Sequence, residues 1–323
     1  DASLEDIYGP NVIWSWNGGL IWVRPTASPQ NLTTVTESTE RGSTTVKLAD
    51  STGLEPGQMV VLSLTDDSGG LGRAFHNGQA DSGDCSWQVP LRHNRPVEIA
   101  SVGEGEVTFV QPLRIPIDTD WQPTIKSAPF LTHVGVEDLT IQFPSDVEYP
   151  GHLNEAGYNG IFITGGVMDS WVRRVHIVDA DNGVLTDQYS KRLTVIDLRL
   201  SGRWGHHGLN VAFTADSLFT NIYWDAEYIH EFTFDHRSNG NVVERAQSNG
   251  MRLSLDHHRD GSHENLFTEF EIPTDFLSGG SQCAGPGAGA RQTFWNMAPG
   301  FIGPPWSRIQ ANVVGDISGE AVQ

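Results

Sequence analysis

Short groups of apolar residues recur through the second half of the chain in the order apolar-x-x-apolar-x-apolar. The middle residues of successive groups lie 36, 23, 24, 24 and 24 residues apart. The six groups are Val136-Leu139-Ile141, Val172-Val175-Ile177, Val195-Leu198-Leu200, Phe219-Ile222-Trp224, Val243-Ala246-Ser248 and Phe267-Phe270-Ile272. Such a regular spacing indicates a structural repeat.

A second set of apolar positions falls between these groups, again at steps of 21 to 25 residues. Its members are Ile161-Ile163, Val184, Leu209-Val211, Phe232-Phe234 and Leu253-Leu255. Each repeat therefore holds at least two short strands, separated by turns rich in Gly, Asn and Asp. One such unit cannot bury its apolar face alone, whereas a parallel stack of units can. The pattern predicts an all-β fold, a right-handed parallel β-helix with coils of about 24 residues that rise by ~4.8 Å each.

Residues 34–115 follow a different pattern, because segments 44–48, 58–64 and 106–110 alternate as antiparallel strands do. We predict three regions: an early β-helix coil over 1–33, a small antiparallel β insertion over 34–115, and the main β-helix with C-terminal loops over 116–323. No amphipathic helix is apparent before the first strands. We therefore expect a bare end of the stack, as in a truncated or processed chain.

The coils from Gly157-Tyr158-Asn159-Gly160-Ile161 to Asn265-Leu266-Phe267-Thr268 resemble the pectin-lyase-like superfamily of right-handed β-helix proteins. The resemblance covers roughly residues 116–317 and lies in coil length and strand pattern. It implies an enzyme that acts on acidic or neutral polysaccharides, as a lyase, hydrolase or epimerase. The same superfamily also includes adhesins and phage tailspikes without catalytic activity.

Charge narrows the choice of partner. Twenty Lys and Arg against 40 Asp and Glu give a net charge of −20, which repels nucleic acid and anionic lipid. We therefore expect a polysaccharide, held through a local basic site, and neither nucleic acid nor a membrane as partner. The lysine-poor, acidic composition favours a secreted or periplasmic protein. Cys85 and Cys283 either pair or stay free, and their spacing does not decide between the two.

Histidines supply the candidate chemistry, because seven of the twelve lie between residues 206 and 263. His207 precedes Leu209 by two residues and His230 precedes Phe232 by two, so the two side chains are predicted to stack about 5 Å apart on adjacent coils. Asp235-His236-Arg237 also matches Asp256-His257-His258-Arg259. The predicted catalytic strip comprises His207, His230, His236, His257, His258 and Arg259, with Tyr228 as a further acid. A purely structural ladder of stacked side chains is the alternative.

β-Elimination at a uronic acid residue would use such a strip. The reaction needs a cation for the sugar carboxylate, a base for the C5 proton and an acid for the leaving oxygen. His207 or His230 is the expected base, and Tyr228 or a second histidine the acid. Four residues are expected to bind substrate: Trp204, Arg237, Arg252 and Arg291. Ca²⁺ is the expected cofactor, with Asp179, Asp181, Asp225, Glu227, Asp235 and Asp256 as candidate ligands.

The first functional hypothesis is therefore a secreted enzyme that cleaves an anionic polysaccharide by β-elimination. A glycoside hydrolase is the second, using Asp179 with Asp181 or Asp225 with Asp256 as its carboxylates, about 5–9 Å apart. A transition-metal site for Zn²⁺ or Cu²⁺, built from imidazoles two coils apart, is a third possibility. A glycan-binding adhesin or tailspike-like module without catalysis is the alternative from another class.

Overall fold

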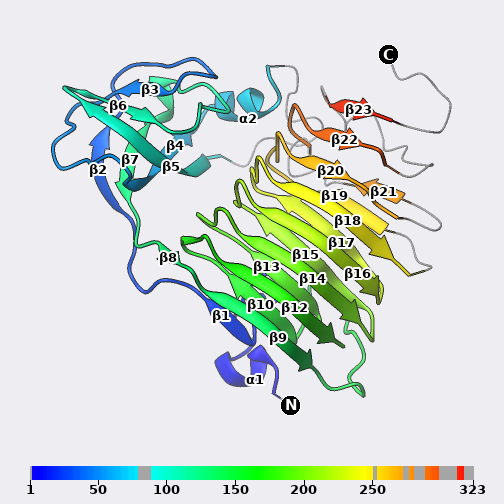
Figure 1. The fold of residues 1–323 in the computed structure, drawn as a ribbon. Helices are drawn as coiled ribbons and strands as arrows, with labels where there is room; N and C mark the ends of the chain where they lie inside the picture. The colour runs from blue at the N-terminus through cyan, green and yellow to red at the C-terminus, as the bar shows by residue number, and fades with distance from the viewer. Residues whose placement is uncertain are drawn as a thin grey trace.

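Most of the chain winds into a right-handed parallel β-helix (Figure 1). The structure is a computed structural model, and it describes residues 2–78, 89–249, 253–271, 276–279, 288–297 and 311–315. One face of the β-helix is an eight-stranded parallel sheet. Its strands are β9 (Gly135–Gln142), β12 (Trp171–Val178), β14 (Thr194–Ser201), β16 (Leu218–Asp225), β18 (Val242–Ser248), β20 (Leu266–Thr268), β22 (Thr293–Trp295) and β23 (Asn312–Val314).

The second face is a seven-stranded parallel sheet that carries the candidate site. Its strands are β1 (Ile21–Val23), β10 (Asn159–Ile163), β13 (Asn182–Thr186), β15 (Gly205–Ala212), β17 (Tyr228–Asp235), β19 (Leu253–His257) and β21 (Phe276–Gly279). A narrow third face begins with β8 (Leu131–Thr132) and β11 (Val167–Met168). Single parallel bridges continue it through Lys191, Ala215, Asn239 and His263.

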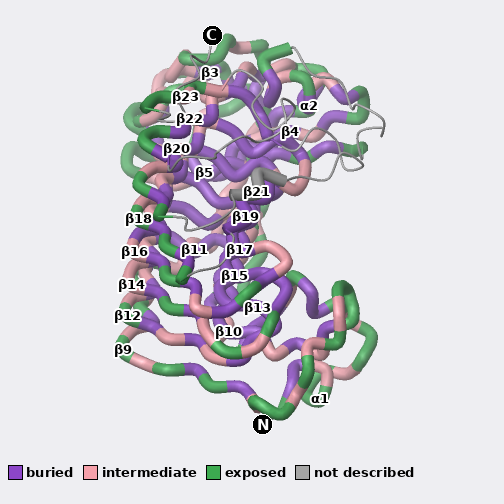
Figure 2. The backbone as a smooth tube through the Cα atoms, turned by 90° about the vertical axis from the view of Figure 1, so that its right-hand side faces the viewer, coloured by how far each residue is buried: buried purple, intermediate pink, exposed green. Residues whose placement is uncertain are grey.

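The strand register confirms the predicted repeat. Val172 pairs with Val136 on one side and with Val195 on the other, and the same column continues to Phe219, Val243 and Phe267. In the seven-stranded sheet Ile161, Val184, Leu209, Phe232 and Leu255 pair in the same way. The residues of these columns are buried (Figure 2), and they form one continuous apolar core.

One residue with a positive φ in successive strands of the eight-stranded sheet explains why two residues, rather than one, separate the first and second apolar positions of each repeat. The ladder between β12 and β14 skips from Arg173↔Ile196 to Val175↔Leu198. The skipped residue has a positive φ, for example 52° at Arg174 and 56° at Asp197. A residue in this conformation lets the strand bend without losing its inward apolar positions.

The insertion forms a separate six-stranded antiparallel sheet with its own core. The strands are β2 (Gln30–Thr34), β3 (Thr45–Lys47), β4 (Met59–Asp66), β5 (Leu91–Gly103), β6 (Glu106–Phe109) and β7 (Thr124–Ser127). They are accompanied by α2 (Gly70–Phe75) and the short 3₁₀ helix η1 (Thr119–Trp121). Because β2 pairs with β7, the antiparallel sheet extends over residues 30–127, wider than the predicted 34–115.

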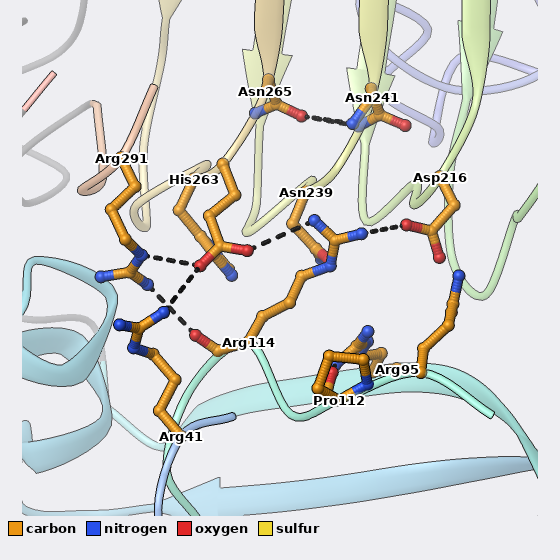
Figure 3. A network of polar contacts seen from close by, with 12 residues as sticks. Arg41, Arg95, Pro112, Arg114, Asp216, Asn239, Asn241, His263, Asn265 and Arg291 are labelled. Atoms are coloured by element: carbon orange, nitrogen blue, oxygen red, sulfur yellow. Dashed lines mark hydrogen bonds and ion pairs between the residues drawn. The ribbon is translucent and has the colours of Figure 1, made fainter. Parts of the chain in front are cut away.

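Ion pairs hold the insertion against the turns of the third face (Figure 3). Arg114 pairs with Asp216 and, at 3.3 Å, with Glu264. Lys191 Nζ lies 2.6 Å from Asp216 and donates to the Pro96 carbonyl at 3.0 Å. Arg291 Nε lies 2.6 Å from Glu264. The guanidinium of Arg291, which was predicted to bind substrate, is part of this interface.

The N-terminal residues cover the first coil. A five-residue helix, α1 (Leu4–Tyr8), starts at Ser3, whose side chain accepts a hydrogen bond from the Asp6 amide. Leu4 is 5% exposed, and its amide donates to the Gly157 carbonyl. The expectation of a bare stack end is therefore wrong. Within the described part of the chain, no helix is long and apolar enough to cross a membrane.

Candidate functional site

A groove of about 430 Å³ lies on the outer face of the seven-stranded sheet. Its floor is made by outward residues of β13 and β15, such as Leu185 and Asn210. The loop around His152 and the N-terminal segment at Trp16 form part of its wall. The turns that follow β17 and β19 complete the lining with Asp235, His236, His258 and Arg259. The groove therefore gathers most of the predicted strip.

The predicted pairing of His207 with His230 is confirmed. The two residues are register partners on β15 and β17, and their rings stack with centroids 5.2 Å apart. Asn159 and Asn182 precede them in the same column, joined by a 2.7 Å hydrogen bond. His207 Nδ1 lies 3.1 Å from Asn182 Oδ1 and 3.2 Å from the Ser15 carbonyl. His207 thus also serves a structural ladder of the kind expected as the alternative.

Burial of His207 disfavours the protonated form of its ring. Its side chain is 5% exposed, and this burial, with the neighbouring histidines, lowers its pKa well below 6.5. His230 is more open, and burial lowers its pKa to about 4. Both rings are therefore neutral at pH 7.

Two carboxylates, Asp187 and Asp235, line the groove. Asp187 follows Thr186, whose partner is Val211, and Asp235 pairs with Ala212. Asp187 and Asp235 are thus two coils apart, which places their Cα atoms about 9–10 Å apart with the small Ala212 between them. Burial raises the pKa of Asp187 to about 6. Burial also disfavours the charge on Asp235, but His236, His258 and Arg259 together outweigh it and lower the pKa of Asp235.

The far wall of the groove is basic. The His236 ring stacks on Phe213 with centroids 4.6 Å apart, and its Nδ1 lies 2.9 Å from Asp235 Oδ2. His258 Nδ1 lies 3.1 Å from Asp256 Oδ2. Burial opposes protonation of His258, yet the Asp256 contact raises its pKa above 6.5. Arg259 Nη2 lies 3.4 Å from His258 Nε2. A partly protonated histidine and an arginine therefore adjoin in this wall.

Two residues that were predicted to be catalytic, His257 and Tyr228, are buried inside the β-helix and do not line the groove. His257 pairs with Phe234 on an inward column, and its ring lies 5.5 Å from that of Phe267. It is fully buried, and desolvation lowers its pKa to about 4. Tyr228 is also fully buried in the apolar core, which raises the pKa of its hydroxyl. The structure therefore does not place His257 or Tyr228 in the predicted strip, because both side chains are fully buried.

The predicted substrate-binding residues are scattered. Arg237 is 5% exposed and lies 3.0 Å from Asp260, so it is not free to hold a sugar carboxylate. Trp204 is 50% exposed and lies beside Tyr149, outside the lining of the groove. Arg252 lies outside the described residues, as do Cys85 and Cys283.

The six carboxylates predicted to hold Ca²⁺ do not come together. Asp179 and Asp181 are both engaged with Arg203, through its backbone amide and its guanidinium respectively. Asp225 pairs with Arg199 on the eight-stranded sheet, and the exposed Glu227 follows it in a turn. Asp235 and Asp256 contact histidines in the groove. Within the described residues, no three of these carboxylates lie within ligand distance of one another, so the residues do not fit a calcium site.

A histidine cluster lies at the groove end nearest the N-terminus. The ligand atoms of His152, His206 and His230 lie within 4.8 Å of one another. His230, His258 and Asp256 form an overlapping group with the same property. His206 Nδ1 lies 2.9 Å from Glu155 Oε1. His152 and Glu155 were not predicted from the sequence, because they lie in a loop outside the repeat.

Asp187 was missed for a different reason. Its position one residue beyond Thr186 corresponds to that of Asp235 beyond Phe234, so the folded repeat carried the signal.

A second hollow, of about 470 Å³, lies on the outer face of the eight-stranded sheet. It is lined by Arg199, Tyr223, Trp224, Asp225, Gln247 and Asn249. Arg199 and Asp225 pair with each other there, at 2.5 Å. The titratable groups with the functionally relevant pKa shifts lie in the groove of the seven-stranded sheet instead.

Comparison with known proteins bears on the fold. No family model matches the chain, and no curated protein matches its sequence. The tailspike of Pseudomonas phage phi297 matches with a TM-score of 0.51 at 10% identity, over 86% of this chain and 49% of that chain. The Acinetobacter baumannii bacteriophage AP22 tailspike, solved with A. baumannii capsular saccharide, gives a TM-score of 0.37 at 8% identity. The match covers 89% of this chain and 57% of that tailspike. The Pseudomonas phage LKA1 tailspike gives a TM-score of 0.36 at 12% identity, over 87% of this chain and 51% of that tailspike.

The chain spans about half the length of these tailspikes. The phi297 likeness confirms the β-helix fold that the repeat predicted.

Proposed function

We propose that the protein binds a polysaccharide in the groove and hydrolyses it, with Asp187 as general acid and Asp235 as general base. One observation carries the proposal: two carboxylates flank one groove, two coils apart, in environments that drive their pKa values in opposite directions. A pair of carboxyl groups with separated pKa values is the arrangement that acid and base roles require.

The spacing favours hydrolysis with inversion. In inverting glycosidases the carboxyl groups are about 6.5–9.5 Å apart, which leaves room for the sugar and the attacking water. A Cα separation of about 9–10 Å between Asp187 and Asp235 is compatible with that range. Ala212, between them, has a side chain too small to block the floor.

Each carboxyl group then has one role. Asp187, with a pKa of about 6, keeps a proton in mildly acidic solution and gives it to the leaving glycosidic oxygen. Asp235 stays ionised because of His236, so it can accept a proton from the attacking water. After one turnover the protons are restored through solvent at the open side of the groove.

Substrate binding would use the groove walls. Trp16 is 46% exposed at the wall and offers an apolar face to a sugar ring. Arg259 and His258 supply positive charge in a chain with a net charge of −20, which favours an anionic sugar at that end. The shared β-helix fold of the phi297 tailspike is compatible with a glycan-binding surface of this kind.

β-Elimination at a uronic acid is the second candidate, and the adjoining His258 and Arg259 favour it. They would neutralise the sugar carboxylate, His236 would take the C5 proton, and Asp187 would protonate the leaving oxygen. His236 is suited to the base role because Asp235 orients its ring.

A panel of acidic and neutral polysaccharides separates the candidates. Hydrolysis releases reducing ends without new ultraviolet absorbance, whereas β-elimination produces reducing ends together with the absorbance of an unsaturated sugar. We expect reducing ends alone, and a loss of about 10²–10⁴-fold in kcat for Asp187→Asn and for Asp235→Asn. Asp138→Asn, on the opposite sheet and paired with Arg174, is the matched control and should keep full activity.

Three outcomes would overturn the proposal as stated. Absorbance from an unsaturated product would replace hydrolysis by β-elimination. Full activity in both groove variants would remove the two carboxylates from the chemistry. Glycan binding without any cleavage would make the protein a binding module.

A further inference from the structure

We propose that His152, His206 and His230 form a binding site for a divalent transition metal of the Zn²⁺ class, at the groove end nearest the N-terminus. The site is separate from the Asp187 and Asp235 pair and does not depend on the proposed hydrolysis. It rests on the placement of three imidazoles and on the carboxylates behind two of them.

The three imidazoles converge from separate segments. His206 lies on β15, His230 lies on β17, and His152 comes from the loop before β10. Their ligand atoms all lie within 4.8 Å of one another. Zn–N bonds of about 2.0–2.1 Å in a tetrahedron require nitrogens about 3.3 Å apart. Closing that difference needs shifts of up to about 1.5 Å, and the exposed loop that carries His152 can supply part of them.

Carboxylates lie behind two of the three ligands. Glu155 Oε1 lies 2.9 Å from His206 Nδ1, and Asp256 Oδ2 lies 3.2 Å from His230 Nδ1. In many protein zinc sites a carboxylate lies beside Nδ1 of the ligating histidine, and Nε2 binds the metal. Glu155 is itself held by Tyr149 at 2.7 Å and by Ser15. The groups behind the ligands are therefore buried and hydrogen-bonded.

Packing fixes two of the rings before any metal binds. The His206 ring stacks on His207 with centroids 3.9 Å apart, and His207 stacks in turn on His230. His206 is 2% exposed.

Ligand chemistry selects the class of ion. Imidazoles suit Zn²⁺, Cu²⁺ and Ni²⁺, whereas Ca²⁺ and Mg²⁺ need oxygen ligands. The overlapping group of His230, Asp256 and His258 shares His230 with the proposed site, so an ion bound by one group excludes a second ion at the other. Three protein ligands leave a fourth position open, and His152 and His206 line the groove. A water or a sugar oxygen would occupy that position.

Zn²⁺ titration of tag-free full-length protein tests the site. The protein is stripped with EDTA, dialysed and titrated with Zn²⁺ by calorimetry, and Co²⁺ loading is followed by visible absorption. We expect one equivalent of bound metal and tetrahedral Co²⁺ bands. His152→Ala and His230→Gln should each lose at least about 100-fold in affinity, and Glu155→Gln about 10–100-fold. His176→Ala, on the eight-stranded sheet, should bind as the wild type does.

His152→Ala keeps the test decisive, because this exposed loop residue can be removed without disturbing the coils. Equal metal binding by the wild type and by His152→Ala would overturn the proposal, as would the absence of saturable binding in a protein with a normal circular dichroism spectrum. Asp187→Asn should bind metal normally. Failure of the hydrolysis proposal is thereby distinguished from failure of the metal site.

Discussion

Asp187→Asn should make the protein more stable at neutral pH while it removes activity. Burial raises the pKa of Asp187 from an ordinary 3.8 to about 6. A shift of about 2 units, at about 1.36 kcal/mol each, corresponds to about 3 kcal/mol of folding free energy. Since the folded state holds the proton more tightly, the penalty is absent below about pH 3.8, grows as the pH rises to about 6, and is complete above that. Asparagine keeps the shape and carries no charge.

Urea unfolding of the wild type and of Asp187→Asn, at about pH 4 and about pH 7.5, measures the effect. We expect the variant to be more stable by up to about 3 kcal/mol at the higher pH, and nearly equal to the wild type at the lower. Asp138→Asn is the control, because that carboxylate is exposed and paired with Arg174, so its loss should give no stabilisation. A variant that is less stable than the wild type at the higher pH, or a stability difference that does not depend on pH, would refute the inference that burial disfavours the charged Asp187 carboxylate.

Two further substitutions test the assigned places of other residues. His257→Phe should keep full activity and equal or exceed the wild type in stability, because both ring nitrogens of His257 lack hydrogen-bond partners among the described residues. The advantage of the variant should grow as the pH falls from 6.5 to about 4, because protonation of His257 in the unfolded state then destabilises the folded wild type. A loss of activity with an intact fold would contradict the assignment of His257 to the core. Arg114→Ala should lower the free energy of unfolding by about 2 kcal/mol, since it leaves Asp216 and Glu264 without one partner. Lys47→Ala removes an exposed pair with Glu106 and should change stability by less than about 1 kcal/mol; equal effects of the two changes would show that the Arg114 contacts do not dock the insertion.

The repeat made the fold predictable to the level of strand register. Because each coil adds one strand per face, apolar residues at a spacing of 24 had to stack, as Val195, Phe219 and Val243 do. The same spacing was enough to predict that His207 pairs with His230.

The repeat was misleading where a residue's direction depended on strand length. The strand that contains Leu253 and Leu255 continues to His257, so this histidine takes the next inward position and not a place in the groove. Tyr228 is buried because β17 begins at that residue, inside the apolar core.

Loops have no place in the repeat. His152 and Glu155 come from a segment with no counterpart in the other coils. The N-terminal segment is held against the coils because the side-chain amides of Asn159 and Asn182 donate hydrogen bonds to the Trp14 carbonyl. Such contacts join residues far apart in sequence, as between Asn159 and Trp14, which are 145 positions apart. They depend on three-dimensional packing that no local pattern encodes.

A crystal structure of the Asp187→Asn variant with bound substrate is the decisive experiment for the proposed groove. An oligosaccharide that the wild type hydrolyses would be crystallised with this variant, in which the proposed acid is disabled. We predict a sugar chain in the groove, with its glycosidic oxygen about 3 Å from the side chain at position 187. A sugar chain bound instead beside Tyr223 on the eight-stranded sheet, with no sugar in the groove, would contradict the proposal.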